Sequence, residues 1–229
     1  LDIPQEQAAT VLSDAQDAAL KNISGGIESG GFAPYLLHGV TGSGKTEVYL
    51  RAIALIKEKG KDTIVLVPEI ALTPQLVMRF KARFRDKIAV LHSRLSPAER
   101  LDAWRRIKNG DVDIAIGARS AIFAPFKNLS LVIVDEEHDQ LYKQEDGVRY
   151  NARDMALVRG KFNNAVVILG SATPAIESYH NAKTGKYQYL TLPERIDKRP
   201  MPEAVVVDLR KDKTSLFSER LIDAIKDRL

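Results

Sequence analysis

Short hydrophobic runs alternate with longer amphipathic stretches along most of the chain. The runs are rich in Val, Ile and Leu and are nearly unbroken, which is typical of strands buried on both faces. The stretches between them have the length and periodicity of helices. This alternation predicts an α/β fold, a mostly parallel sheet with helices on both faces. The expected strands are 35–39, 63–68, 87–92, 112–117, 129–137 and 165–171, and the expected helices are 45–59, 74–85, 97–109 and 151–161.

The two ends of the chain depart from this alternation. Hydrophobic residues at helical spacing predict a helix over 10–23, and the glycine-rich segment 24–31 predicts a loop. Toward the other end, the proline- and charge-rich segment 192–203 predicts a linker, which a strand at 204–210 and a final helix follow. The chain opens on Leu1 rather than Met and closes within an amphipathic pattern, so we expect a piece of a longer protein.

Composition and charge narrow the class of protein without deciding its function. The sequence is 45% hydrophobic and 28% charged, as in ordinary globular proteins. It has no hydrophobic run of the roughly 20 residues that a membrane helix needs, and no signal-peptide pattern, so no membrane partner is expected. The absence of cysteine excludes disulfides and thiolate metal sites in this sequence. The formal net charge of +4 permits a nucleic-acid partner but does not require one.

The segment GVTGSGKT matches the phosphate-loop pattern G-x-x-x-x-G-K-[ST], and it follows an expected strand and opens an expected helix. Backbone N–H groups of such a loop bind phosphates at a helix N-terminus. Lys45 can reach the β- and γ-phosphates, and the Thr46 hydroxyl can bind Mg²⁺. The alternative interpretation is a glycine-rich turn before a helix. The expected nucleotide-binding residues are Gly39, Val40, Thr41, Gly42, Ser43, Gly44, Lys45 and Thr46.

Acidic residues follow a hydrophobic strand in the segment LVIVDEEHD. Asp135 and Glu136 lie at the carboxyl end of this strand, where α/β sheets place their ligands. Asp135 can hold Mg²⁺ and Glu136 can polarise an attacking water, so these two and Lys45 are the expected catalytic residues. The alternative is a solvated acidic turn. A zinc site is not expected, because His138 has no cysteine partners and the other histidines are scattered.

The segments DEEH at 135–138 and GSATP at 170–174 resemble motifs II and III of superfamily 2 helicases, whose lobes are RecA-like phosphate-loop NTPase folds. This resemblance implies that His138, Ser171 and Thr173 couple the nucleotide site to nucleic acid. Gln16 stands where the adenine-recognising Q motif is expected. LVPEIALTPQ at 66–75 and GARSAIFAPF at 117–126 resemble motifs Ia and Ib, which contact the DNA backbone. The DNA-binding residues that this implies are Pro68, Thr73, Gln75, Arg119 and Ser120.

A narrower resemblance covers nearly the whole chain. LHSRLSPAER, DEEHDQLYKQEDGVRYNARDMA and LGSATPAIES, in this order, resemble the family of bacterial primosomal replication helicases. The resemblance implies an ATP- and Mg²⁺-dependent helicase that moves 3′ to 5′ and acts on single-stranded and forked DNA when stalled replication forks are restarted. It also implies a cytoplasmic location and, as partners, primosome and replisome-loading proteins and the single-stranded-DNA-binding protein.

Within that family, the chain resembles the first of two motor lobes. The implied division is an N-terminal helix with the Q motif and the glycine-rich loop over 1–31, a RecA-like ATP-binding lobe over 32–195, and a linker with the start of a truncated second lobe over 196–229. Zinc is expected only in a cysteine-rich insertion outside this sequence. An arginine of the second lobe is worth ~10³–10⁵ in rate in related enzymes, so we expect this chain alone to bind nucleotide weakly and hydrolyse it poorly.

The segment 141–154 directly follows the acidic motif and combines aromatic residues with cations. Aromatic rings among cations suit stacking on unpaired bases, worth ~1–3 kcal/mol per base. The resemblance agrees, because the family has an aromatic-rich loop here that links DNA binding to hydrolysis. The alternative is that Tyr150 packs in the core and that Arg153 pairs with an acid. The expected DNA-binding residues are Tyr142, Lys143, Arg149 and Tyr150.

Two other features favour structural roles. The cation-rich segment 79–87 predicts a solvated helix face, with Met78, Phe80 and Phe84 turned toward the core. Trp104 is also expected in the core.

Other function classes stay open at this point. A GTPase would need a guanine-reading N-K-x-D motif, which is absent, and no substrate lid of a kinase can be identified. A nucleotide-regulated interaction module that does not hydrolyse ATP is a second alternative, although the complete Asp135–Glu136 pair favours hydrolysis. A third alternative is another superfamily 2 DNA translocase.

Overall fold

The computed structural model describes residues 11–197, 205–210 and 217–228. The chain divides into two compact units, Leu1–Asp197 and Lys198–Leu229. In the second unit the described residues form one helix, α7 (Glu219–Lys226), which Ser218 caps by accepting a hydrogen bond from the Leu221 N–H. The site lies in the first unit.

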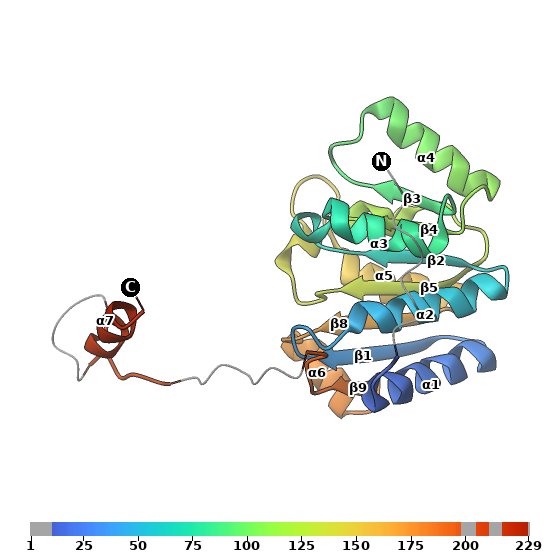
Figure 1. Ribbon diagram of the computed structural model, residues 1–229. Coiled ribbons are helices and arrows are strands. Elements are labelled where there is room, and N and C mark those ends of the chain that lie inside the picture. Colours follow the sequence, from blue (N-terminus) through green and yellow to red (C-terminus); the bar gives the residue numbers. More distant parts are fainter. Residues whose placement is uncertain (1–10, 198–204, 211–216, 229) are drawn as a thin grey trace. The chain divides into compact units, whose positions relative to one another are not determined.

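A parallel seven-stranded sheet forms the centre of the first unit, in the order β3-β4-β2-β5-β8-β1-β9 (Figure 1). Every pair of neighbours in it is parallel, so all carboxyl ends of these strands lie along one edge. This confirms the predicted α/β, RecA-like arrangement. The strands are β1 (Ala33–Gly39), β2 (Asp62–Leu66), β3 (Ile88–Leu91), β4 (Ile114–Gly117), β5 (Leu129–Asp135), β8 (Val166–Ser171) and β9 (Gln188–Leu192), of which β9 was not predicted.

Helices cover both faces of the sheet and create two hydrophobic cores (Figure 1). In β1, Tyr35 and Leu37 belong to one core, while Leu36 between them belongs to the other, as the alternation of strand side chains requires. Because both faces are covered, the strands are hydrophobic at nearly every position. One face carries α1 (Asp14–Ser29), α2 (Lys45–Glu58) and α3 (Pro74–Phe84), and the other carries α4 (Pro97–Asn109), α5 (Ala152–Asn163) and α6 (Ile176–Lys183).

The predicted loop at 24–31 is wrong over most of its length, because α1 continues through both of its internal glycines to Ser29. The helix starts at Asp14 behind a capping box formed by Ser13 and Gln16, and Thr10 of the predicted helix lies outside the described residues. Gly26 has a packing role: an added Cβ would overlap the Tyr35 hydroxyl, which donates to the Asn22 carbonyl at 3.0 Å. Close packing against β1 therefore overrides the low helix propensity of glycine.

Three other expectations need correction. Phe80 and Phe84 are buried as predicted, but Met78 and Trp104 are exposed, because the inward stripes of α3 and α4 pass through other residues. The expected strand at 204–210 has no strand partner in its described part, which begins at residue 205. The sequence did not predict a small antiparallel hairpin, β6 (Lys143–Gln144) with β7 (Tyr150–Asn151). It also did not predict three short 3₁₀ helices, η1 (Glu69–Ala71), η2 (Arg119–Phe123) and η3 (Gln140–Tyr142).

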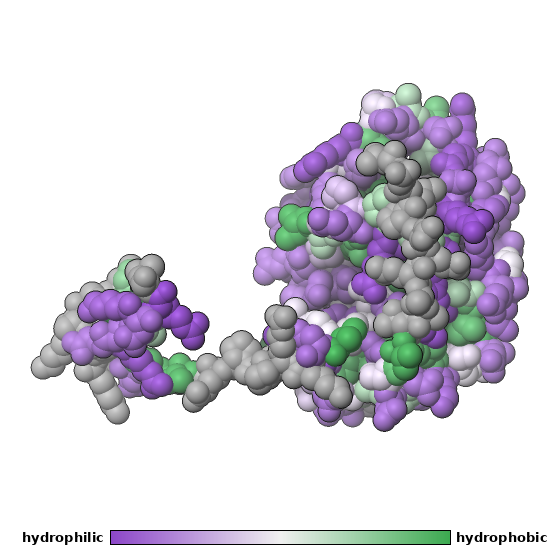
Figure 2. Space-filling view, viewed as in Figure 1, coloured by the Kyte–Doolittle hydropathy of each residue, from purple (hydrophilic) through white to green (hydrophobic). Residues whose placement is uncertain are grey.

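The face that carries α1 to α3 is mainly hydrophilic, with hydrophobic residues in small separate patches (Figure 2). In the described ranges, no helix has the length and hydrophobic character needed to cross a bilayer.

Candidate nucleotide site and polar network

The phosphate-loop segment connects the carboxyl end of β1 to the first residue of α2. A tight backbone turn shapes it, in which the Ser43 N–H donates to the Val40 carbonyl at 3.0 Å. Gly42 and Gly44 have φ values of 81° and 80°, in the left-handed region that favours glycine. The loop thus leads directly into a helix N-terminus, which attracts anions.

Lys45 and Ser43 present polar groups to the interior of this loop. The Lys45 ammonium is buried and donates to the Gly39 carbonyl at 3.0 Å, while the Glu136 carboxylate lies 3.9 Å away. The buried Ser43 hydroxyl has no hydrogen-bond partner. Buried polar groups are normally satisfied, so an unpaired hydroxyl inside a phosphate loop fits a ligand with oxygen atoms. The residues present therefore suit a nucleotide phosphate.

Gln16 lies beneath the loop and supports it. Its side-chain N–H group donates to the Ser43 carbonyl at 3.0 Å and lies 3.4 Å from the Gly44 carbonyl, while its oxygen accepts from the Ser13 N–H at 2.9 Å. The capping box of α1 and the support of the phosphate loop thus use one side chain. The adenine contact predicted for Gln16 stays a prediction.

A segment after β9 covers the loop from another side, and the sequence analysis missed it. The Ile196 N–H donates to the Gly42 carbonyl at 3.0 Å, and a Cβ added to Gly44 would lie 2.5 Å from the Ile196 Cδ1. Arg195 lies beside Gly42, and its buried Nε has no hydrogen-bond partner. No sequence motif marks these residues, because their place follows from the pairing of β9 with β1.

Asp135 ends β5 beside the loop, as predicted. Its Oδ1 accepts a hydrogen bond from the Tyr49 hydroxyl at 3.0 Å, and its backbone carbonyl accepts one from the Tyr142 hydroxyl at 2.6 Å. Burial raises the pKa of the Asp135 carboxyl, and the Glu136 charge raises it further. Oxygen donors such as Asp135 and Thr46 suit Mg²⁺, which takes one or two protein ligands together with substrate phosphates.

The described residues contain no cluster of three or more His, Cys, Asp or Glu side chains that could hold a metal alone. Mg²⁺ in proteins typically completes its coordination with water and with substrate phosphates.

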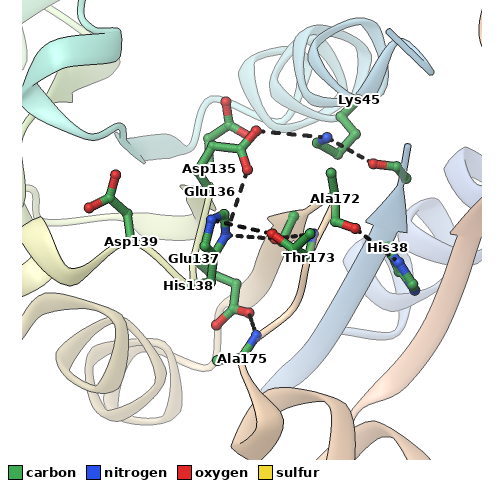
Figure 3. A network of polar contacts seen from close by, with 12 residues as sticks. His38, Lys45, Asp135, Glu136, Glu137, His138, Asp139, Ala172, Thr173 and Ala175 are labelled. Atoms are coloured by element: carbon green, nitrogen blue, oxygen red, sulfur yellow. Dashed lines mark hydrogen bonds and ion pairs between the residues drawn. The ribbon is translucent and has the colours of Figure 1, made fainter. Parts of the chain in front are cut away.

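The three predicted coupling residues contact one another beside Glu136, and Figure 3 shows His138 and Thr173 among them. The His138 Nδ1 lies 3.7 Å from the Glu136 carboxylate and 2.8 Å from the Ser171 hydroxyl, and its Nε2 lies 3.4 Å from the Thr173 hydroxyl. Glu136 has φ +47°, which is uncommon for a residue other than glycine and directs this turn. A continuous set of polar contacts thus runs from Lys45 through Glu136 and His138 to Ser171 and Thr173.

Glu137 was not singled out from the sequence, yet it is the most buried acid of the motif, 1% exposed. Its carboxylate accepts from the Ala175 N–H and the Ser178 hydroxyl, both at 2.7 Å, and lies 3.5 Å from the Arg153 guanidinium. Glu137 therefore fixes the start of α6 behind the GSATP segment. Its position between two polar residues after a strand gave no sign of this burial.

The residues of the motif Ia segment separate into buried and exposed ones. Pro68 is buried and caps η1, where its carbonyl accepts from the Ala71 N–H at 2.8 Å, so this geometry does not support the DNA contact predicted for Pro68. Thr73 caps α3 by accepting from the Leu76 N–H at 3.3 Å, and Gln75 is exposed in the first turn.

Arg119 and Ser120 lie at the start of η2, with Ser120 exposed. The Arg119 guanidinium donates to the Lys143 carbonyl at 2.8 Å and reaches the Leu141 carbonyl at 3.5 Å. It therefore holds the segment that follows the acidic motif, a contact that the sequence did not indicate.

Tyr142 corrects a prediction in that segment. Its side chain is only 1% exposed and its hydroxyl binds the Asp135 carbonyl, so the ring cannot stack on a DNA base. Tyr150 is half-buried and packs edge-on against Phe123, with ring centroids 5.1 Å apart. The core position considered for Tyr150 is therefore the one that Tyr142 occupies, while Tyr150 is only partly buried.

A hollow of about 660 Å³ lies on the β6–β7 hairpin. Lys143 and Arg149 are exposed there, whereas Arg153 lies within 3.5 Å of Glu137 and 3.0 Å of Asp154. The acid-pairing alternative for Arg153 is therefore correct. The hollow is lined by Lys143, Gln144, Glu145, Arg149, Tyr150, Asn151, Arg153 and Asp154.

Comparisons with known proteins agree with this geometry. The family model of the DEAD/DEAH box helicases matches residues 5–182. The chain is 48% identical to replication restart protein PriA of Bacillus subtilis over 95% of its own length and 28% of that protein. It is 46% identical to PriA of Chlamydia pneumoniae, over 95% of this chain and 30% of that protein. The chain thus spans about a third or less of the length of these relatives.

Solved structures give the same fold. RecG bound to a three-way DNA junction is 28% identical, with a TM-score of 0.62 over 83% of this chain and 25% of RecG. A hypothetical ATP-dependent RNA helicase from Sulfolobus tokodaii is 20% identical, with a TM-score of 0.56 over 80% of this chain and 53% of that chain, which shows likeness of fold alone. Because the family match covers most of the sequence and the acidic and phosphate-loop residues meet as such a match requires, the chain belongs to the DEAD/DEAH box helicase family.

Proposed function

We propose that this chain is the ATP-binding first motor lobe of a DNA helicase that moves 3′ to 5′ and restarts stalled replication forks. The observation that supports this most is the polar network that begins at Lys45 and ends at Thr173. The names of the relatives, PriA proteins at 46–48% identity, indicate replication restart. The proposed DNA is single-stranded or forked, and the proposed location is the cytoplasm.

In this proposal, bound Mg²⁺ neutralises the developing charge on the ATP phosphates. The phosphate-loop backbone and Lys45 bind the phosphates, and Thr46 and Asp135 hold the metal. Glu136 orients the attacking water and accepts its proton, since its carboxylate is partly exposed and lies beside Lys45. The His138 Nδ1 lies near both Glu136 and Ser171, and its Nε2 lies near Thr173, so His138 can relay a shift between Glu136 and these two hydroxyls.

The DNA side of the proposal uses residues at the carboxyl edge of the sheet. Parallel α/β sheets bind ligands at this edge. Contacts to the DNA backbone suit a motor that ignores base sequence. Arg119 also supports this surface, because it donates a hydrogen bond to the backbone of the hairpin. The residues proposed to contact DNA are Thr73, Gln75, Arg119, Ser120, Lys143, Arg149 and Tyr150.

The division into 1–31, 32–195 and 196–229 is part of the same proposal, and the compact unit that ends at Asp197 supports the second boundary. Partners from the primosome, the replisome-loading machinery and the single-stranded-DNA-binding protein belong to the longer protein. Hydrolysis by this chain alone is expected to be weak, because the arginine finger of two-lobed motors is expected in the second lobe.

Steady-state ATPase activity of the longer protein, with and without forked DNA, tests the function. We expect strong stimulation by DNA that a Lys45→Ala variant loses, while a Lys61→Ala variant at the opposite edge of the sheet keeps it. Turnover that ignores DNA would instead favour a nucleotide-regulated interaction module. Stimulation by DNA without strand separation would favour a translocase of another kind, and a polarity assay on tailed duplexes decides the direction.

A further inference from the structure

A buried tyrosine outside the recognised motifs touches two of them. Tyr49 lies on α2, four residues after Lys45, and its side chain is 1% exposed. Its hydroxyl donates to the Asp135 Oδ1 at 3.0 Å. Burial and the nearby carboxylates raise the pKa of the Tyr49 phenol well above its ordinary value, so the hydroxyl stays protonated and remains a donor.

The same hydroxyl lies against the strand that leads into the GSATP segment. A Cβ added to Gly170 would overlap the Tyr49 hydroxyl and lie 2.9 Å from the ring carbon that carries it. A side chain at position 170 would therefore overlap the Tyr49 phenol. The next residue, Ser171, contacts His138. Tyr49 thus lies where the phosphate-loop helix, the acidic motif and β8 meet.

We propose that Tyr49 is a positioning residue for the metal site and that it holds the Asp135 carboxylate at a fixed place relative to Lys45 and Thr46. This inference rests on the proposed function, in which Asp135 and Thr46 hold Mg²⁺. One rigid helix carries Lys45, Thr46 and Tyr49, so it sets the place of the phosphate-binding amine, of the metal-binding hydroxyl and, through the phenol, of the carboxylate. Groups that orient metal ligands typically change metal affinity 10–100-fold when removed.

Without the phenol, the buried Asp135 carboxylate would lose the hydrogen bond that the Tyr49 hydroxyl donates to it. Burial and the Glu136 charge already disfavour the ionised form of this carboxyl. A carboxylate free to turn away from the metal lowers affinity for the metal–nucleotide complex more than for the nucleotide alone. A purely structural tyrosine would instead change stability and leave the metal dependence unchanged. Tyr35 provides that comparison, because it is also fully buried and its hydroxyl donates to the Asn22 carbonyl at 3.0 Å, away from the acidic motif.

The test uses Tyr49→Phe and Tyr35→Phe variants of the longer protein and a fluorescent, non-hydrolysable ATP analogue. Its dissociation constant is measured with Mg²⁺ and with EDTA, beside the thermal unfolding midpoint. We expect Tyr49→Phe to weaken binding about 10-fold with Mg²⁺ and less than about 2-fold with EDTA. Tyr35→Phe should lower the midpoint and leave both constants unchanged. Equal weakening in Mg²⁺ and EDTA, or no weakening, would overturn the positioning role.

An Asp135→Asn variant separates this inference from the proposed function. If Asp135→Asn removes the effect of Mg²⁺ while Tyr49→Phe does not, the metal site stands and the role of Tyr49 is wrong. If Mg²⁺ never affects binding by the unmodified protein, both fail together. The double variant gives a second measurement: we expect Tyr49→Phe to add nothing to Asp135→Asn, whereas additive effects would show that the two residues act independently.

Discussion

At the scale of single residues, the phosphate-loop glycines are constrained for different reasons. Gly39 has no room for a side chain, since an added Cβ would lie 2.5 Å from the Ser43 hydroxyl. Gly42 needs its positive φ, but an added Cβ would make only an ordinary contact, 3.8 Å from the Arg195 Cγ. Gly44 has both constraints, because its φ is 80° and an added Cβ would overlap Gln16 and Ile196. Gly44 is therefore the least replaceable of the three.

A Gly44→Ala variant should bind nucleotide at least about 10-fold more weakly, because its methyl group must displace the Gln16 side chain and the Ile196 segment. Gly60→Ala is the matched control: its φ is 64°, but nothing lies within 4 Å of the added Cβ. Both variants should lose about 1–2 kcal/mol of stability from left-handed strain. Titration with a fluorescent ATP analogue and urea unfolding check this, and equal nucleotide affinity in the two variants would contradict it.

The Asp135 carboxyl illustrates a conflict between function and stability at one residue. Because its pKa is raised in the folded protein, the folded state binds its proton more tightly than the unfolded state does. The contribution of Asp135 to the free energy of unfolding is therefore most favourable at a pH below the pKa of the unfolded state. This contribution is lost as the pH rises through the pKa of the folded state. Asp135→Asn should therefore raise the free energy of unfolding at pH 7, by the order of 1 kcal/mol typical of single changes, while abolishing turnover. Urea unfolding should show this gain shrinking as the pH falls through the raised pKa of the folded state toward that of the unfolded state, and a gain that grows instead would contradict the assignment.

At the scale of elements, α1 is a support for the phosphate loop. Gln16 in its first turn binds the loop, and Gly26 near its end allows it to approach β1. Gly25 and Gly26 are adjacent in one helix, yet only Gly26 faces the Tyr35 hydroxyl, since nothing lies within 4 Å of a Cβ added to Gly25. The helix therefore tolerates one of these glycines and needs the other.

This difference predicts opposite effects of one substitution at adjacent positions. Gly25→Ala should stabilise the protein by about 0.5–1 kcal/mol, because alanine loses less backbone entropy in a helix. Gly26→Ala should destabilise it, since the methyl group breaks the hydrogen bond from Tyr35 to Asn22 or moves the helix. Thermal unfolding of both variants is the measurement. Stabilisation by both would mean that α1 does not pack against β1 as described.

At the scale of the lobe, the parallel sheet has two different edges. The carboxyl edge gathers the phosphate loop after β1, the acidic motif after β5 and the GSATP segment after β8 (Figures 1 and 3). The β6–β7 hairpin follows β5 at the same edge, and its exposed cations lie one short segment from Asp135. DNA bound there would lie next to the nucleotide site, so contacts with the two ligands can affect each other.

The two edges should differ in their contribution to DNA binding. Lys143→Ala, on the hairpin, should weaken binding to single-stranded DNA and lower the slope of log K against log salt by about 1, as expected for one lost phosphate contact. Lys61→Ala, an exposed change just before β2 begins, removes the same charge at the opposite edge and should leave the slope unchanged. Fluorescence anisotropy at several salt concentrations measures both. Equal slopes for the two variants would mean that Lys143 does not touch DNA.

Local patterns in the sequence were sufficient for six of the seven strands of the sheet, all except β9, and for the edge at which these strands end. Nearly continuous hydrophobic runs give buried parallel strands because both faces of the sheet are covered. His138, Ser171 and Thr173 were assigned by resemblance to helicase motifs. The residues that follow the strands must meet at one edge, so Lys45, Asp135 and Glu136 could be placed together before any coordinates. Their placement depends only on the order of elements and on short spacings.

The tertiary structure alone decided which side chains of a given type are buried and what they touch. Tyr142 and Tyr150 occur in one aromatic and cationic segment, but only Tyr142 reaches the Asp135 carbonyl, which buries its ring. Tyr49 and Gly170 are 121 residues apart (170 − 49), and their mutual fit depends on how α2 crosses β8. Contacts of this kind have no local signal, because packing brings together residues whose chemical patterns are unrelated along the chain.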